Sequence, residues 1–230
     1  MLQCQNLRKT YGSKVAVGNI TTTIVPGKIY ALLGSNGSGK TTFMKMVAGL
    51  VKPSSGEISF CGMPIGPESK KYIAYMPTEG FFYSYMTCRD AGKFYKDFYQ
   101  DFDENKYYYL LQEMNLDPNI KVSKMSSGMV AKAKLALTLA RNASIIMLDE
   151  PLNGIDIIAR DKIIETVLKN ASPNNAIIMS SHLVDELEKI IDYAIFVRHG
   201  DVVMQGDAEA LRTHYQRSIV DMYREIYKYD

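Results

Sequence analysis

Residues 34–41 read Gly34-Ser35-Asn36-Gly37-Ser38-Gly39-Lys40-Thr41, a complete match to the phosphate-binding pattern G-x-x-x-x-G-K-[ST]. The glycines let backbone N–H groups turn inward around a polyphosphate, because a side chain there would fill the space that the phosphate needs. We expect the Lys40 ammonium to reach the terminal phosphates and the Thr41 hydroxyl to hold the accompanying Mg²⁺. The pattern therefore predicts a site for a nucleotide phosphate and its magnesium ion.

The sequence on either side of this loop has the character of a strand and of a helix. Residues 28–33 are an apolar run that predicts a buried strand, and residues 42–50 predict a helix that ends at Gly49. A helix that starts near Gly39 directs its positive dipole end and its free amides at the same anion. This strand–loop–helix order distinguishes a phosphate loop from an ordinary glycine-rich turn.

Two further apolar runs end in polar residues that suit the same site. Residues 145–148 predict a strand buried on both faces, followed by Asp149 and Glu150, and a similar run at 176–179 leads through two serines to His182. Ligands of parallel α/β sheets bind outside the carboxyl ends of the strands. We therefore expect Asp149 to approach the Mg²⁺, directly or through water. Glu150 is expected to polarise a water against the γ-phosphate, and His182 to contact that phosphate.

An alternation of apolar and polar residues that begins at 2–5, and two short runs at 15–17 and 20–25, predict small antiparallel strands before the loop. Tyr11 lies in the first turn region between them. Its ring either stacks on a purine base or belongs to a half-buried surface tyrosine, and the local sequence leaves both interpretations open.

Residues 85–138 predict an inserted helical subdomain that is rich in aromatic residues. Five aromatics recur at helical spacing and are expected on one apolar face that packs in the core: Phe94, Tyr95, Phe98, Tyr99 and Phe102. Near the end of this region, Ser126 and Gly128 precede an Ala- and Leu-rich helix. Ser126 is either a plain N-cap or, with the amides near Gly128, part of a second anion-binding helix terminus.

The composition excludes several classes of protein. A net charge of +2 marks neither a nucleic-acid-binding surface nor a membrane-adsorbing face. Three cysteines without C-x-x-C spacing argue against a disulfide scaffold or a zinc site and suit a reducing cytosol. The chain has no signal-peptide-like start and no run of the ~20 apolar residues that span a bilayer. We expect a soluble intracellular protein with no nucleic-acid partner and no direct membrane insertion.

In this order the features resemble the nucleotide-binding subunit of an ATP-binding-cassette (ABC) transporter, over nearly the whole chain. In the terms of that family, the matching segments are the Walker A loop from Gly34 to Thr42, the signature segment at 125–129, the Walker B strand at 145–150, the D-loop at 151–156 and the switch histidine His182. The signature, D-loop and histidine separate this family from other NTPases. The resemblance implies an α/β fold: a P-loop NTPase (RecA-like) core with an N-terminal antiparallel β subdomain and an inserted α-helical subdomain.

The resemblance also implies the extent of the domain, the cofactors and the site residues. It implies one ABC ATPase domain over residues 1–215 and a C-terminal helical tail at 216–230, which serves either packing or partner docking. ATP and Mg²⁺ are the implied cofactors of an Mg-dependent ATPase. Implied catalytic roles fall on Lys40, Glu150 and His182. Implied metal contacts fall on Thr41 and Asp149, and Thr78 occupies the position of a third. Implied nucleotide contacts are Tyr11, Gly34, Ser35, Asn36, Gly37, Ser38, Gly39, Lys40, Thr41, Thr42, Ser126, Ser127, Gly128 and Asp156.

Two departures from the family pattern bear on hydrolysis. The family signature L-S-G-G-Q has a glycine where this chain has Ser127, and Met125 and Met129 replace its Leu and Gln. Thr78 stands where the family has a glutamine that faces the metal and the attacking water. Thr78 is too short to reach them, so we expect that Glu79 substitutes or that the coupling geometry is altered.

The resemblance implies partners as well. Two ATPase subunits, identical or related, are expected to pair head to tail, so that each ATP lies between one Walker A loop and the other subunit's Ser126 segment. A separate membrane-spanning permease subunit is expected to hold the chain at the cytoplasmic face of the cell membrane. The aromatic residues 81–86 either dock that permease or pack within the helical insert. The short chain and its insert resemble exporter subunits of Gram-positive bacteria that handle peptides or drugs. A soluble ABC ATPase and a slow nucleotide-dependent dimer switch are the alternatives.

Overall fold

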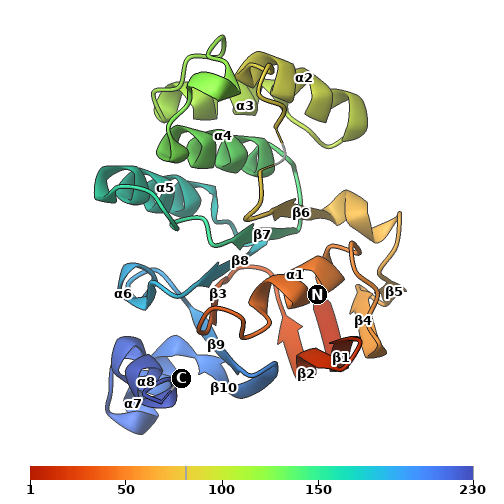
Figure 1. Cartoon of the computed structure of the whole chain (residues 1–230), viewed down its shortest axis with the longest axis vertical. Helices are drawn as coiled ribbons and strands as arrows, with labels where there is room; N and C mark the ends of the chain where they lie inside the picture. The colour runs from red at the N-terminus through yellow and green to blue at the C-terminus, as the bar shows by residue number, and fades with distance from the viewer. Residues whose placement is uncertain (81, 230) are drawn as a thin grey trace.

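One continuous twisted sheet runs through the middle of the structure, a computed structural model that describes residues 1–80 and 82–229 (Figure 1). Within these residues the strand order is β5-β4-β1-β2-β10-β9-β3-β8-β7-β6. The strands are β1 (Leu2–Tyr11), β2 (Lys14–Ile24), β3 (Ile29–Leu33), β4 (Ser55–Phe60), β5 (Met63–Pro64), β6 (Ile73–Met76), β7 (Ile145–Asp149), β8 (Ala176–Ser181), β9 (Tyr193–Arg198) and β10 (Asp201–Asp207). The helices are α1 (Lys40–Val47), α2 (Cys88–Phe98), α3 (Glu104–Glu113), α4 (Ser127–Leu139), α5 (Ile157–Asn170), α6 (Val184–Leu187), α7 (Ala208–Tyr215) and α8 (Ile219–Ile226), with 3₁₀ turns at Ser69–Tyr72 and Val122–Lys124.

Strands β3, β8, β7 and β6 are parallel, and their carboxyl ends face the predicted site. Strand β8 lies between β3 and β7, with Leu33 opposite Ser181 and Asp149 opposite Ser180. Every residue of β3, β7 and β8 is buried, as expected for parallel strands covered on both faces. The carboxyl ends of these three strands therefore share one edge of the sheet, and the glycine-rich loop starts there.

The antiparallel part of the sheet corrects one prediction. The runs at 15–17 and 20–25, expected as two strands, belong to the single strand β2, which pairs with β1. Lys9 pairs with Val17 while Leu7 pairs with Ile20, so β2 carries one extra residue between its two runs. A β-bulge of this kind bends the strand without ending the pairing, and therefore no turn separates the runs.

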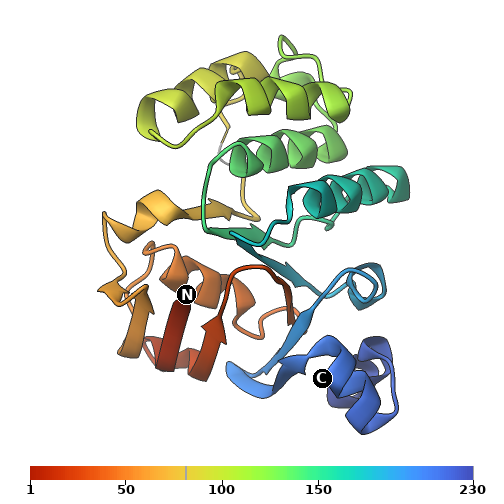
Figure 2. The same ribbon diagram turned by 180° about the vertical axis from the view of Figure 1, so that it is seen from behind.

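Helices α2, α3 and α4 lie together at one end of the molecule, and α5 lies between them and the rest (Figures 1 and 2). Helix α4 contacts α2, α3 and α5 as well as strands β6 and β7. The Ala- and Leu-rich face of α4 therefore connects the helical layer to the edge of the sheet that holds β6 and β7.

The five aromatic residues from Phe94 to Phe102, in α2 and just after it, only partly fulfil the prediction of one buried face. Phe102 is buried, and Tyr95 and Tyr99 pack partly buried against the core. Phe94 and Phe98, however, are 49% and 69% exposed, and their rings lie 4.5 Å apart on the outside of the helix. These two residues are one helical turn apart, at the border of the face that buries Cys88, Ala91 and Gly92, and among the described residues no neighbouring element covers them, so the prediction was wrong for them.

Arg141, which follows α4, joins the helical layer to the edge of the sheet. Its side chain is 4% exposed, and its Nε donates to both carboxylate oxygens of Asp101 at 3.1 Å. The guanidinium also donates to three backbone carbonyls in residues 70–73, at 3.0–3.1 Å, and lies 4.0 Å from the centre of the Tyr99 ring. One buried cation thus satisfies acceptors from two segments that are about 30 residues apart in the sequence, residues 70–73 and Asp101.

We expect Arg141→Met to lower the free energy of unfolding by about 3–5 kcal/mol, because it leaves a partly buried carboxylate and three carbonyls without their donor. Urea denaturation followed by circular dichroism measures the loss. The control Lys169→Met removes a cation that is 53% exposed, where an ion pair is worth about 1 kcal/mol or less. A loss for Arg141→Met as small as that of the control would contradict this interpretation.

The C-terminal helices α7 and α8 pack beside α6 at the other end of the molecule (Figure 1). Ile219 and Met222 of α8 are buried, and the Ile219 N–H donates to the carboxylate of Glu188 at 2.8 Å. Beyond the helix, the Tyr227 hydroxyl donates to the carbonyl of Val197 at 2.9 Å. Residues 216–230 were expected either to pack within the chain or to dock a partner. The described part of this tail packs within the chain.

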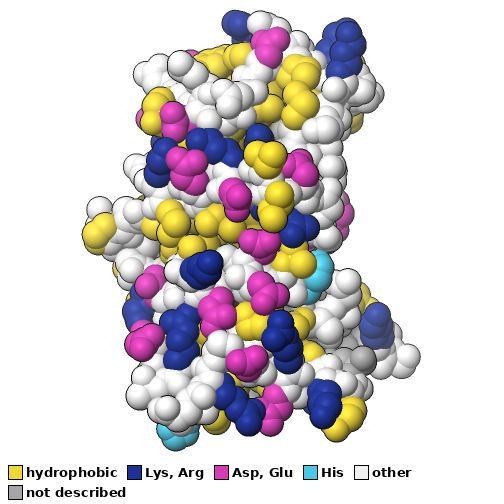
Figure 3. Space-filling model, turned by 90° about the vertical axis from the view of Figure 1, so that its left-hand side faces the viewer, with side chains coloured by type: hydrophobic (Ala, Val, Ile, Leu, Met, Phe, Trp, Pro, Cys, Tyr) yellow, Lys and Arg dark blue, Asp and Glu magenta, His cyan; other side chains and the backbone are white. Residues whose placement is uncertain are grey.

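Basic and acidic side chains are interspersed over the face drawn in Figure 3, in keeping with the small net charge. Among residues 1–80 and 82–229, no helix has both the length and the apolar character that crossing a bilayer requires.

Candidate nucleotide-binding site

The glycine-rich loop borders an open cleft of about 490 Å³. The cleft is lined by Tyr11, Lys14, Ala16, Asn36, Gly37, Ser38, Gly39, Lys40, Thr41, Thr42, Thr78, Glu79, Glu150 and Asn153. These residues come from the turn between β1 and β2, the loop and the start of α1, and the segments that follow β6 and β7. The fold thus gathers most of the predicted site residues around one cleft.

Glycine is required at two positions of the loop for different reasons. Gly39 has φ of 109°, and a Cβ there would clash with the carbonyl oxygen of Ala16. Gly34 leaves no space for a Cβ because the Ser38 side chain and the Val197 carbonyl press against it. The loop therefore packs closely against neighbouring backbone at both positions, and larger residues would push it away.

The Lys40 side chain is held inside the loop that it follows. It is 5% exposed, and its Nζ donates to the carbonyls of Gly34 at 2.7 Å and Ser35 at 3.1 Å. The same nitrogen lies 3.2 Å from Oε1 of Glu150. The ammonium is thus preorganised at the floor of the cleft by the first two residues of the loop.

The Asp149 carboxylate, 1% exposed, is the acceptor of a hydrogen-bond network at the end of β7. Its Oδ1 accepts from the Ser180 hydroxyl at 2.7 Å and from the Thr41 hydroxyl at 3.1 Å, and its Oδ2 accepts from the Tyr75 hydroxyl at 3.0 Å. A carboxylate beside a hydroxyl is an oxygen donor set that fits Mg²⁺ bound with a phosphate. The structure therefore brings Thr41 and Asp149 together as predicted from sequence.

Tyr75 and Ser180 are members of this network that the sequence reasoning missed. Both come from strands next to β7, since Tyr75 is opposite Met147 and Ser180 is opposite Asp149. The signal that could have found them is their position near the ends of apolar runs at 73–76 and 176–181. Burial, and then the Asp149 carboxylate, raise the pKa of the Tyr75 hydroxyl, so this group stays a donor.

We expect Tyr75→Phe to raise the Mg²⁺ concentration that half-saturates ATP hydrolysis by about tenfold, because groups that orient a metal ligand are worth about 10- to 100-fold in metal affinity. Hydrolysis measured across a Mg²⁺ titration at constant ATP tests this. Tyr72→Phe, which removes a hydroxyl from a tyrosine that is 44% exposed, is the matched control. A variant whose Mg²⁺ dependence equals that of the control would exclude a role for Tyr75 in orienting Asp149.

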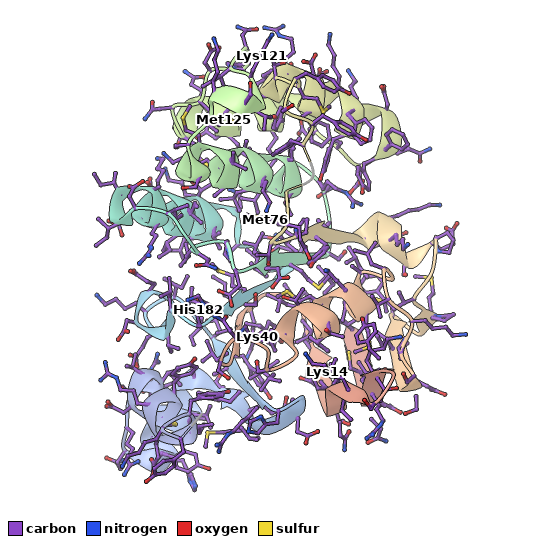
Figure 4. All side chains as sticks on the ribbon, viewed as in Figure 1. Lys14, Lys40, Met76, Lys121, Met125 and His182 are labelled. Carbon is purple, nitrogen blue, oxygen red and sulfur yellow. The ribbon has the colours of Figure 1, made fainter. Side chains whose placement is uncertain are left out.

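Glu150 lies between the loop lysine and the predicted histidine. Its φ of 48° is in the left-handed region, and its backbone N–H donates to the Ser180 hydroxyl at 2.8 Å. The carboxylate is 9% exposed, and its Oε2 lies 2.9 Å from Nδ1 of His182. Backbone strain of this kind persists where the surroundings hold the residue in place, and it recurs at functional sites. The segments that follow β3, β7 and β8 thus place Glu150 in contact with both Lys40 and His182, which lie close together in Figure 4.

Tyr11 lines the cleft and is 50% exposed, with the Lys9 ammonium 5.1 Å from the centre of its ring. Its exposure on the cleft wall is compatible with a stacking role. His199 and His214 do not line the cleft.

The signature segment lies away from the cleft of its own chain. Ser126 caps α4 by accepting from the Met129 N–H at 3.2 Å, and the Ser127 hydroxyl donates to the Gly154 carbonyl at 2.9 Å. Asp156 caps α5 in the same way, by accepting from Ala159 N–H. In Figure 4 Met125, next to Ser126, is far from Lys40. The plain N-cap role of Ser126 is present, and one chain alone does not bring Ser126, Ser127, Gly128 or Asp156 to the loop.

Thr78 reaches the backbone of Asp149 and not its carboxylate. The Thr78 hydroxyl donates to the Asp149 carbonyl at 3.3 Å. The neighbouring Glu79 carboxylate lines the cleft and forms an ion pair with Lys45 of α1 at 2.6 Å, and hydrogen bonding to Lys45 lowers the pKa of Glu79. At this point of the cleft wall, Glu79 therefore has a longer side chain than Thr78, and it is acidic. Its ion pair with Lys45 attaches it to α1, the helix that follows the phosphate loop.

Comparisons with known proteins agree with this geometry. A family model described as ABC transporter matches residues 17–153. The lantibiotic transport ATP-binding protein SrtF of Streptococcus pyogenes is 32% identical over 209 residues, which cover 90% of this chain and 91% of that protein. A solved ATP-binding subunit of an ABC transporter superposes with a TM-score of 0.87 at 25% identity, covering 98% of both chains. A dimeric ATP-binding cassette bound to ADP and Pi gives a TM-score of 0.80 at 20% identity, over 90% of this chain and 98% of that one.

The predicted fold class, a P-loop NTPase core with an antiparallel β part and a helical insert, is confirmed by these superpositions. The cofactor prediction of ATP with Mg²⁺ agrees with the family and with the donor set at Thr41 and Asp149. With a family model over more than half of its length and a relative at 32% identity, the chain belongs to the ABC transporter family, as one of its ATP-binding and ATP-hydrolysing subunits.

Proposed function

We propose that this chain supplies the hydrolytic power for a transporter whose membrane-spanning subunit is a separate chain. The observation that carries the proposal is the cluster of Lys40, Glu150 and His182, with separations of 3.2 and 2.9 Å, beside the Thr41–Asp149 pair. Binding a nucleotide needs only the phosphate loop, whereas a buried carboxylate next to a histidine suits a reaction that moves a proton from water.

The proposal assigns a role to each of these residues. The loop amides and the Lys40 ammonium hold the β- and γ-phosphates, and Thr41 and Asp149 hold the metal. Mg²⁺ bound there neutralises the charge that develops on the phosphate oxygens. Glu150 orients the attacking water and accepts its proton, while His182 holds the Glu150 carboxylate and contacts the γ-phosphate.

A head-to-tail pair of subunits completes the site in this proposal. Ser126, Ser127 and Gly128 lie outside the cleft of their own chain, and a second subunit would bring its own copy of this helix terminus to the γ-phosphate. Closure adds amide dipoles where charge develops and excludes water. Tyr11 would stack on the adenine at the rim, and Asp156 would lie at the contact between the two subunits. The dimeric cassette of the same fold that holds ADP and Pi supports this arrangement.

The proposed dock for the permease is a groove of about 570 Å³ between β6 and α2. Tyr75, Pro77, Phe94 and Phe98 are among its lining residues. An amphipathic helix suits such a groove, because apolar side chains one turn apart can seat in it. Next to the groove, Phe82, Tyr83 and Met86 line a smaller cavity that shares Phe94 and Tyr95 with it. Tyr83 and Tyr85 are exposed, with stacked rings whose centres lie 5.5 Å apart, whereas Phe81 lies outside the described residues. In this way the chain would sit at the cytoplasmic face of the cell membrane through its permease.

Co-expression with membrane-spanning subunits found among the neighbouring reading frames tests the proposal. We expect the double substitution Phe94→Ser and Phe98→Ser to reduce co-purification about tenfold, since large aromatic anchors commonly cost about 1–4 kcal/mol each when truncated. ATP binding by the isolated variant should stay unchanged. Tyr215→Ser, which removes an exposed aromatic from α7, is the control. Co-purification of the double variant at the control level would contradict the proposed dock.

For the cargo, we propose export of a peptide or drug in a Gram-positive bacterium. The support is the relative named for lantibiotic transport in Streptococcus pyogenes, which matches this chain over most of its length. Survival of cells that carry or lack this chain, challenged with lantibiotic-type peptides, tests that substrate class.

A further inference from the structure

The segment after β6, residues 77–79, is tied to three other elements at once. The Thr78 hydroxyl donates to the carbonyl of Asp149 at the end of β7, and the Glu79 carboxylate pairs with Lys45 on α1. The third tie comes from α4, the helix that begins after Ser126. Its Lys134 ammonium donates to the carbonyls of Thr78 at 3.0 Å and Glu79 at 3.2 Å.

Lys134 is unusual for its surroundings. It is 5% exposed and lies within the apolar stretch 133–137 of α4, where every residue is buried. Burial lowers the pKa of its ammonium, while the nearby carboxylates of Glu79 and Asp149 oppose that shift. A buried ammonium costs free energy that an apolar residue in the same place would not. Its hydrogen bonds to two carbonyls offset part of this cost. Both carbonyls belong to residues 77–79, the segment in which Thr78 stands at the position of the family's glutamine.

We propose that Lys134 is a positioning residue that makes residues 77–79 and helix α4 move as one unit. The side chain at position 78 is too short to bridge the cleft, so the link between the nucleotide site and the helical layer runs instead from Asp149 through Thr78 to the Lys134 ammonium. This inference rests on the proposed function, because it assigns the linked unit a role in ATP-driven pairing. A displacement of the segment at the cleft wall would turn the Ser126 end of α4, which the partner subunit's nucleotide is proposed to contact.

The test uses the full chain with Glu150→Gln as parent, so that ATP-bound dimers accumulate. Analytical ultracentrifugation with Mg-ATP gives the dimer dissociation constant, and a fluorescent ATP analogue gives the nucleotide affinity of the monomer. We expect Lys134→Met to raise the dimer dissociation constant about tenfold, within the 5- to 150-fold range typical of coupled sites. The monomer's nucleotide affinity should change less than about twofold, and amide exchange at residues 78–80 should become faster.

Lys132→Met is the matched control, since it removes the same charge from the same helix where the side chain is only half-buried. Lys134→Gln keeps a donor that reaches one carbonyl, and we expect an intermediate weakening; this variant also decides the question should Lys134→Met not fold. If the Lys134 variants dimerise as tightly as the Lys132 control, with exchange at 78–80 unchanged, the inference is overturned while the proposed function stands. A parent that stays monomeric in Mg-ATP would instead overturn the proposed function itself.

Discussion

Glu150→Gln lowers phosphate release about 10³-fold while leaving ATP-dependent dimerisation intact, because a positioned general base is worth about 10²- to 10⁴-fold. Lys40 and His182 lie 3.2 and 2.9 Å from the two oxygens of the Glu150 carboxylate. The amide has nearly the same shape, so it can stay between them. It cannot accept a proton from water. Steady-state phosphate release and sedimentation in Mg-ATP, on the same preparation, measure both halves of this result.

Glu68→Gln is the control for this prediction, since it removes a carboxylate that is 74% exposed. Its phosphate release should match that of the wild-type chain. Hydrolysis by Glu150→Gln at the wild-type rate would exclude Glu150 as the base. If the wild-type chain itself releases no phosphate with its membrane partner present, the nucleotide-dependent switch replaces the motor as the function.

Lys40→Met raises the dissociation constant for Mg-ATP about 100-fold, because the ammonium makes charge-assisted hydrogen bonds worth about 1.5–3 kcal/mol with phosphate oxygens. Methionine has a similar length and is compatible with the buried position, so the loss reflects the charge and not a cavity. Isothermal titration calorimetry measures the affinity. Dimerisation in Mg-ATP should fail in parallel.

The exposed Lys52→Met serves as the control for the loss of one positive charge. We expect the affinity of this control to change less than about twofold. Nucleotide affinity of Lys40→Met equal to that of the control would show that the phosphates bind elsewhere than in the loop.

In the aromatic insert, the periodicity of apolar residues did not predict which side chains are buried. Helical spacing placed Phe94, Tyr95, Phe98 and Tyr99 on one apolar face, yet a stripe that wide can extend beyond the surface that the neighbouring helices cover. All four side chains line the groove, but Tyr95 and Tyr99 also pack against the core, whereas Phe94 and Phe98 stay exposed. Which part of the stripe is covered depends on where α2 docks, and that is decided by residues distant in the sequence.

The signature segment shows a different limit. The local sequence left Ser126 as an N-cap or as an anion contact, and the structure contains the cap. An anion contact supplied to a second subunit leaves no trace in the contacts of one chain. The two roles are compatible, because the cap uses the side chain of Ser126 while the free amides of the first turn stay available.

The phosphate loop, its strand and helix, and the acidic pair after the 145–148 run were determined by the sequence itself. Each depends on local properties: the freedom of glycine, the periodicity of apolar residues and the charge at a strand end. Only the tertiary structure decided that Tyr75 and Ser180 hold Asp149, and that Lys134 holds residues 78 and 79. These contacts depend on the register of parallel strands and on the docking of α4, which burial of distant residues sets and no local pattern encodes.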